Sequence, residues 1–97
     1  MKIFQDLVFV PENNTTGGGI QKALLRFDNG YGVSVLTGPG ALATIEKPYE
    51  LAVIKYLNNS DYRIIYPIIF NCDVITCLTS DEVTLYMKII QSLPELY

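Results

Sequence analysis

The chain has 97 residues, of which 49% are hydrophobic and 18% are charged, with seven Lys and Arg against ten Asp and Glu. This length and composition predict one small folded domain and argue against both a disordered chain and a series of membrane spans. Histidine and tryptophan are absent, which excludes an imidazole general base, His-ligated zinc and a Ser-His triad. The net charge of −3 argues against a surface for nucleic-acid phosphates, so we expect no nucleic-acid partner.

The first predicted strand covers residues 3–10 (IFQDLVFV), because this mostly apolar run ends at a proline, which cannot donate a backbone hydrogen bond. Residues 12–19 (ENNTTGGG) are polar and rich in glycine, as flexible connections are. The dipeptide Asn-Gly at 29–30 then predicts a hairpin between strands at residues 20–28 and 32–37.

The register of this hairpin is a conflict between two signals. A two-residue turn places Leu25 opposite Ser34, whereas the hydrophobic pattern favours Leu25 opposite Val35, and a one-residue slip exchanges core for solvent. A bulge at 31–32 satisfies both, so we assign Gly32 a backbone role in preference to a site of close ligand approach.

Two more strands follow an irregular segment at residues 38–43, which Gly-Pro-Gly introduces. Residues 49–57 (YELAVIKYL) carry apolar side chains on both faces, so we expect both faces to be partly covered. A turn cluster at 58–61 leads to the strand at residues 62–68. Sequential strands with short connections lie side by side, which predicts an antiparallel meander.

The last element is a helix. Residues 69–78 are apolar but irregular in pattern, and we interpret them as a crossing from sheet to helix. Thr79 followed by Glu82 forms a capping box at the start of a helix over residues 80–93, and Pro94 prevents its continuation. The predicted fold is therefore α+β: an antiparallel β-meander of four or five strands with one C-terminal α-helix packed on a face.

The helix carries more apolar surface than one sheet face covers. At 100° per residue, Val83, Met87 and Ile90 form a core-facing stripe, while Leu85 and Ile89 extend the apolar arc well beyond it. Either the segment 69–78 or the segment 38–48 covers these two side chains, or they contact a partner, since extended apolar surface rarely stays bare.

We assign the candidate partner interface to four residues, two on the helix and two in the connection before it. They are Leu85, Ile89, Ile69 and Phe70. We expect the partner to be another protein, and a second copy of the chain is the other occupant that we consider.

Catalytic chemistry is not indicated. Asp81 and Glu82 suit the helix cap better than acid–base catalysis, and neither Cys72 nor Cys77 has a cation nearby in sequence to activate it. Two cysteines without histidine are too few ligands for a zinc site, and we expect free thiols. We predict no catalytic residue, no metal and no cofactor.

Neither a signal peptide nor a membrane partner is expected. The opening MKIFQDLVFV contains a basic residue and apolar residues, but Gln5 and Asp6 interrupt the apolar run. No apolar stretch approaches the ~20 residues that a membrane-spanning helix needs. We expect a cytoplasmic protein.

The pieces FDNGYGVSVLTGPGAL (27–42), YELAVIK (49–55) and DVITCLTSDEV (73–83) resemble, in that order, a family of small bacteriophage proteins without assigned function. The resemblance covers residues 20–93. Members of the family are richer in Asp and Thr before the last helix, close to DTPITDDV, where this chain has YPIIFNCDV (66–74). The resemblance implies expression in the cytoplasm of an infected bacterium and transfers no active-site residue.

These observations predict a small non-enzymatic interaction protein of bacteriophage type that binds and modulates a host or phage protein. An inhibitor of a bacterial defence system is one instance. The alternative is a module that sequesters a nucleotide or similar anion. It would use glycine loops 17–19 and 38–40 with Lys22, Arg26 or Arg63, around a pocket of several hundred cubic ångströms.

Overall fold

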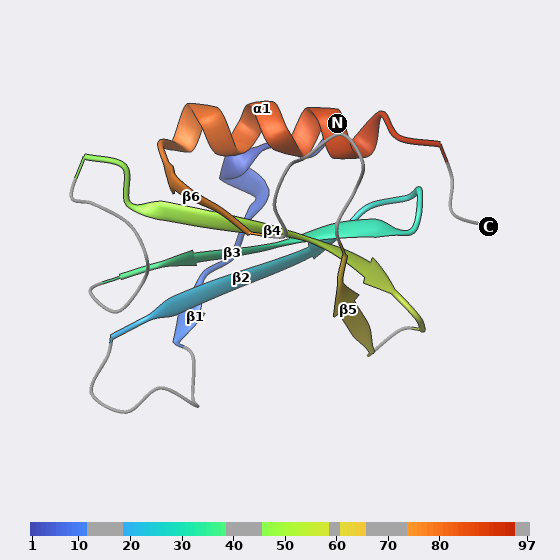
Figure 1. The fold of residues 1–97 in the computed structure, drawn as a ribbon, viewed down its shortest axis with the longest axis horizontal. Coiled ribbons are helices and arrows are strands. Elements are labelled where there is room, and N and C mark those ends of the chain that lie inside the picture. The colour runs from blue at the N-terminus through green and yellow to red at the C-terminus, as the bar shows by residue number, and fades with distance from the viewer. Residues whose placement is uncertain (12–18, 39–45, 59–60, 66–73, 95–97) are drawn as a thin grey trace.

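The computed structural model of the chain describes residues 1–11, 19–38, 46–58, 61–65 and 74–94. These residues form an α+β fold in which one helix lies across a twisted antiparallel sheet (Figure 1). In chain order the elements are η1 (Phe4–Asp6), β1 (Val10–Pro11), β2 (Gln21–Arg26), β3 (Tyr31–Thr37), β4 (Tyr49–Tyr56), β5 (Tyr62–Ile64), β6 (Val74–Leu78) and α1 (Ser80–Gln91).

The sheet is the predicted meander with one strand added. Strands β1 to β5 are neighbours in chain order, and all the pairs are antiparallel. Strand β6 pairs with the first half of β4, on the edge whose second half pairs with β5. The interpretation of residues 69–78 as an irregular crossing is therefore wrong for 74–78.

The main core lies between the sheet and α1. Side chains alternate along β3 and β4, so one residue in two points toward the helix. On this face Val33, Val35 and Leu51 are fully buried, and Val53 retains only 2% of its exposure. The helix covers these four sheet residues with its buried side chains Val83, Met87 and Ile90.

The opposite face of the central strands is buried as well. Ile54 is completely buried there, and Ser34, Glu50 and Ala52 each expose less than a tenth of their surface. The expectation that both faces of β4 are covered is confirmed. The side chains that reach across this second face are described with the candidate sites below.

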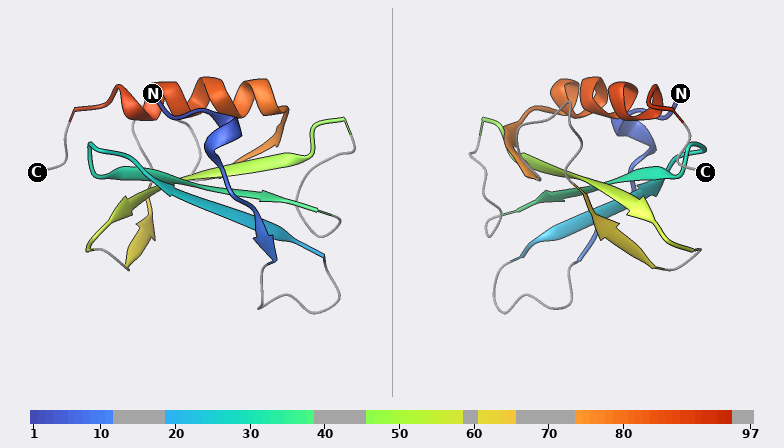
Figure 2. Two further views of the ribbon diagram at one scale, coloured as in Figure 1. Left: turned by 180° about the vertical axis from the view of Figure 1, so that it is seen from behind. Right: turned by 45° about the vertical axis from the view of Figure 1, so that its right-hand side comes forward.

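The N-terminal segment, residues 1–11, is the largest departure from the predicted elements. Its expected strand at 3–10 is wrong: Phe4–Asp6 is a short 3-10 helix, and only Val10–Pro11 pairs with β2. Figure 2 shows this segment running from α1 down to the edge of the sheet. The rings of Phe4 and Phe9 pack on Tyr49, with centroids 4.9 and 5.9 Å away, which fixes the segment over the core.

The β2–β3 hairpin has a register that differs by two residues from the expected one. Leu25 pairs with Val33. The backbone N–H of Gly30 donates to Phe27 O at 3.3 Å, and Gly30 has φ +90°, so the extra residue sits in the turn and the bulge expected at 31–32 is wrong. A two-residue shift preserves the faces, which is why the predicted core pattern still holds.

Candidate interaction surface on helix α1

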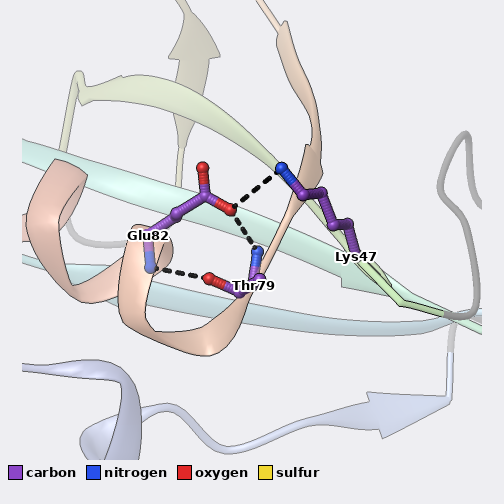
Figure 3. Close-up of polar contacts among 3 residues, drawn as sticks. All are labelled: Lys47, Thr79 and Glu82. Carbon is purple, nitrogen blue, oxygen red and sulfur yellow. Dashed lines mark hydrogen bonds and ion pairs between the residues drawn. The ribbon is translucent and has the colours of Figure 1, made fainter.

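The first turn of α1 is fixed by the predicted capping box, which Figure 3 shows. The Thr79 hydroxyl accepts from the backbone N–H of Glu82 at 3.2 Å, and Glu82 Oε1 accepts from the N–H of Thr79 at 3.0 Å. Lys47 Nζ lies 3.8 Å from the same carboxylate. The backbone hydrogen bond from Thr79 is the main cause that lowers the pKa of Glu82 below its usual value.

The last turn of α1 is fixed by a residue from the β2–β3 hairpin. The Asn29 side chain donates through Nδ2 to the carbonyls of Ile90 at 2.8 Å and Leu93 at 3.1 Å, and its Oδ1 accepts from Tyr31 N at 3.2 Å. These carbonyls belong to the helix end, where intrahelical donors run out. Sequence analysis predicted Asn29 only as a turn residue and missed this role, because the contact joins positions 61 residues apart.

One side of α1 is held by the N-terminal segment. Phe4 N donates to Thr84 Oγ1 at 3.1 Å. The Gln91 amide exchanges two hydrogen bonds with the backbone of Lys2, at 2.8 and 2.7 Å. With the sheet below and this segment beside it, the helix presents its remaining side to solvent.

The remaining side carries the two predicted helix residues. Leu85 is 56% exposed and Ile89 is 36% exposed, and they lie one helical turn apart. Both side chains are therefore accessible to solvent, and most of the two segments considered as covers lies outside the described residues. Ile69 and Phe70, the other two residues of the predicted interface, lie outside the described residues. We call Leu85 and Ile89 the α1 strip.

The α1 strip can supply binding energy but no reaction. Covering the exposed parts of one Leu and one Ile contributes roughly 1–3 kcal/mol at ordinary apolar transfer values. The strip stands on a helix fixed at both ends, so binding requires little ordering of the surface. A rigid apolar strip of this size suits the centre of a modest protein interface.

The alternative anion site is not assembled by the described residues. Lys22 donates to Tyr62 Oη at 2.8 Å, and Arg26 stacks over the Tyr56 ring at 5.3 Å, both on the second face of the sheet. Arg63 follows Tyr62 along β5 and pairs with Lys55, so it points to the opposite face.

These contacts give the cations a role in covering the sheet. The rings of Tyr56 on β4 and Tyr62 on β5 lie 5.9 Å apart, and Lys22 and Arg26 reach them from β2, on the other side of β3. Burial, the largest cause, raises the pKa of Tyr56, and the neighbouring Tyr62 adds to the rise. Sequence analysis considered Lys22 and Arg26 only as cations of an anion site and missed their tyrosine partners.

The two glycine loops, 17–19 and 38–40, contact each other at Gly19 and Gly38. Gly19 and Gly38 have φ of +62° and +115°, and a Cβ on Gly38 would lie 2.4 Å from the Gly19 carbonyl oxygen. Backbone packing at the end of the β2–β3 pair therefore requires glycine at position 38. Residues 17, 18, 39 and 40 lie outside the described residues.

Two open hollows adjoin each other near the last turn of α1, with volumes of about 410 and 320 Å³. They share Met1, Asp28 and Gln91 in their walls. Among the described residues, their linings contain neither glycine nor arginine, so this part of the chain does not form the pocket expected for an anion.

Cys77 carries a free thiol, whereas Cys72 lies outside the described residues. Cys77 has φ +60° and sits where the β4–β6 register slips by one residue between Leu78 and Ile75. This is the left-handed position of a bulge, which glycine normally occupies. The unusual backbone thus belongs to the bend that leads from β6 into α1.

A comparison with protein-family models, with curated proteins and with solved structures gives no match for this chain. Among the helices of the described residues, none is both long enough and apolar enough to cross a membrane.

Proposed function

We propose that the chain is a non-enzymatic interaction protein that binds another protein through the α1 strip. The observation that carries the proposal is the exposure of Leu85 and Ile89 on a helix that is otherwise packed and capped. Two neighbouring apolar side chains on a rigid helix, bordered by polar residues such as Asp81 and Lys88, have the arrangement of an apolar centre with a polar rim that protein interfaces use.

The partner in this proposal is a host or phage protein, following the resemblance of the chain to small bacteriophage proteins. Binding would modulate that partner in the cytoplasm of an infected bacterium, and inhibition of a bacterial defence protein is one instance. A second copy of the chain seated on the α1 strip is the competing outcome.

The experiment compares three tagged forms of the chain in pull-downs from bacterial lysate. They are the wild type, the strip variant Leu85→Asp/Ile89→Asp, and the sheet variant Leu24→Asp/Ile64→Asp. Leu24 and Ile64 are 41% and 49% exposed on the second face of the sheet, so the sheet variant introduces the same charges on similarly exposed apolar side chains. Circular dichroism establishes that each variant is folded.

We expect the wild type and the sheet variant to recover the same protein and the strip variant to lose it. Equal recovery by all three folded forms would contradict the proposal. Sedimentation of the purified wild type separates the competing outcome: a dimer that the strip variant abolishes would assign the strip to self-association.

A further inference from the structure

The hairpin turn that holds the last turn of α1 contains a reactive pair of residues. In an Asn-Gly sequence the backbone nitrogen of the glycine can attack Cγ of the asparagine side chain. A new C–N bond closes a succinimide ring, the side-chain nitrogen leaves as ammonia, and water then opens the ring to aspartate or isoaspartate. Gly30 has no Cβ to shield its nitrogen, so this pair is the least hindered kind for the reaction.

The fold restrains both reacting groups. The Asn29 residue is 8% exposed, and its Nδ2, the leaving nitrogen, donates to Ile90 O and Leu93 O. The attacking nitrogen of Gly30 donates its own hydrogen to Phe27 O at 3.3 Å. The succinimide ring can therefore close only when the Asn29 side chain leaves the helix end and the backbone N–H of Gly30 breaks its hydrogen bond to Phe27 O. The proton of that N–H then leaves with the ammonia.

We propose that Asn29 is a deamidation site which the folded state protects and whose modification releases the last turn of α1. The product at position 29 has no Nδ2 hydrogens, so Ile90 O and Leu93 O both lose the hydrogen bond from the side chain, and Ile90 O keeps only backbone donors such as Leu93 N at 3.1 Å. It also places a carboxylate against the negative end of the helix dipole. The change is irreversible once the amide has been lost as ammonia, because the modified side chain can no longer donate hydrogen bonds to the end of the helix.

This inference does not depend on the proposed binding function. It rests on the Asn-Gly pair and on its contacts with Ile90 O and Leu93 O, none of which involves the side chain of Leu85 or Ile89. Its consequence is that the hydrogen bonds between Asn29 and the end of α1 are lost slowly as the protein ages. The rate of this loss depends on how often the hairpin and α1 separate.

The test follows deamidation at position 29 by peptide mass spectrometry, in native buffer and in denaturant at the same mildly alkaline pH. We expect the native rate to be at least about tenfold lower, because two hydrogen bonds of ordinary net strength hold the Asn29 amide closed. A synthetic peptide with the sequence of residues 26–33, incubated in the same two solvents, is the reference for the effect of the solvent on the reaction itself. Equal rates at position 29 in both solvents would overturn the protection.

Two variants complete the test. Gly30→Ala, measured only in denaturant, should slow the reaction at position 29, because the new Cβ hinders the attacking nitrogen; an unchanged rate would overturn the assignment of the reactive pair. Asn29→Asp reproduces one product. We expect a lower melting temperature or no folded protein, whereas Asp28→Asn, on the exposed neighbour, should stay close to wild type. A wild-type melting temperature for Asn29→Asp would overturn the release of the helix end.

Discussion

At the scale of single residues, the sequence correctly predicted that position 32 requires glycine, but the reason that it gave, a bulge, was wrong. The residue was expected in a bulge, but it lies in regular pairing between Arg26 and Ile54. Glycine is needed because a Cβ there would lie 2.5 Å from Leu25 O and 2.7 Å from the Tyr56 ring. The ring packs across the strand in the space that a side chain would fill.

We therefore expect Gly32→Ala to destabilise the fold by about 1–3 kcal/mol, the usual cost of overpacking. The measurement is chemical unfolding followed by circular dichroism. In the Tyr56→Leu background the alanine should cost less than in the wild type, because the clash with the ring is gone, but part of the cost should remain because Leu25 O lies 2.5 Å from the same Cβ. The same alanine cost in both backgrounds would show that Tyr56 is not the obstacle.

Cys77 allows a second test at this scale. Because its φ of +60° suits glycine, Cys77→Gly should be more stable than Cys77→Ala by about 1 kcal/mol. At the neighbouring Thr76, which does not share the positive φ, the order should reverse, since glycine weakens an ordinary strand position. Equilibrium unfolding of the four variants measures both differences, and an advantage for alanine at position 77 would contradict the bulge geometry.

At the scale of elements, α1 was the most predictable part of the chain because its signals are local. The Thr79–Glu82 capping box lies within four residues, and both of its hydrogen bonds form as expected. The helix ends at Gln91, two residues before the predicted position 93. The other helix end depends on Asn29, and no local pattern reveals a partner 61 positions away.

The elements that sequence analysis missed also depend on distant contacts. Residues 3–10 have the apolar pattern of a strand, but Phe4 and Phe9 pack on Tyr49, and residues 4–6 form a 3-10 helix. Residues 74–78 lack a regular pattern because the bulge at Cys77 interrupts their alternation. In both cases packing against β4 decides the local structure, and the sequence of the segment alone does not contain that information.

The capping box predicts a pH dependence of stability. Because the pKa of Glu82 is lowered in the folded state, its carboxylate stabilises the fold above pH about 4.5, and this contribution is lost as the pH falls through the folded-state pKa. Glu82→Gln keeps a capping oxygen but cannot titrate. We expect its melting temperature to fall less steeply than that of the wild type as the pH is lowered from 6 to about 3.

Asp81→Asn is the matched control for this experiment, because it removes a carboxylate from the same first turn but not the one that closes the box. Its melting temperature should follow the wild-type pH profile more closely than Glu82→Gln does. Identical profiles for the wild type and Glu82→Gln would contradict the stabilising role of the ionised cap.

At the scale of the whole molecule, the chain buries both faces of its central strands and fixes one helix at both ends. The sheet and the N-terminal segment leave one side of α1 exposed, and the fold does not need that side for its core. Asp substitutions at Leu85 and Ile89 should therefore change stability by less than about 1 kcal/mol each, whereas Met87→Asp should unfold the domain. Thermal unfolding compares the two sites, and similar large losses would place the strip in the core.

The architecture could be predicted from sequence, but the function of its surfaces could not be established in the same way. Alternation along β3 and β4 and the helical period of α1 identify the faces that meet in the core. Leu85 and Ile89 stand out because they do not fit that core. The chemistry of a partner, by contrast, leaves no repeating pattern in a single chain.

The binding constant of the recovered partner for three purified forms of the chain tests the central claim most directly. The forms are the wild type, Leu85→Asp/Ile89→Asp and Leu24→Asp/Ile64→Asp. We predict that Kd rises at least about tenfold for the first double variant, the equivalent of about 1.4 kcal/mol, and stays within about threefold for the second. Tight binding by the strip variant, or weakening only by the sheet variant, would contradict the assignment of the interface to α1.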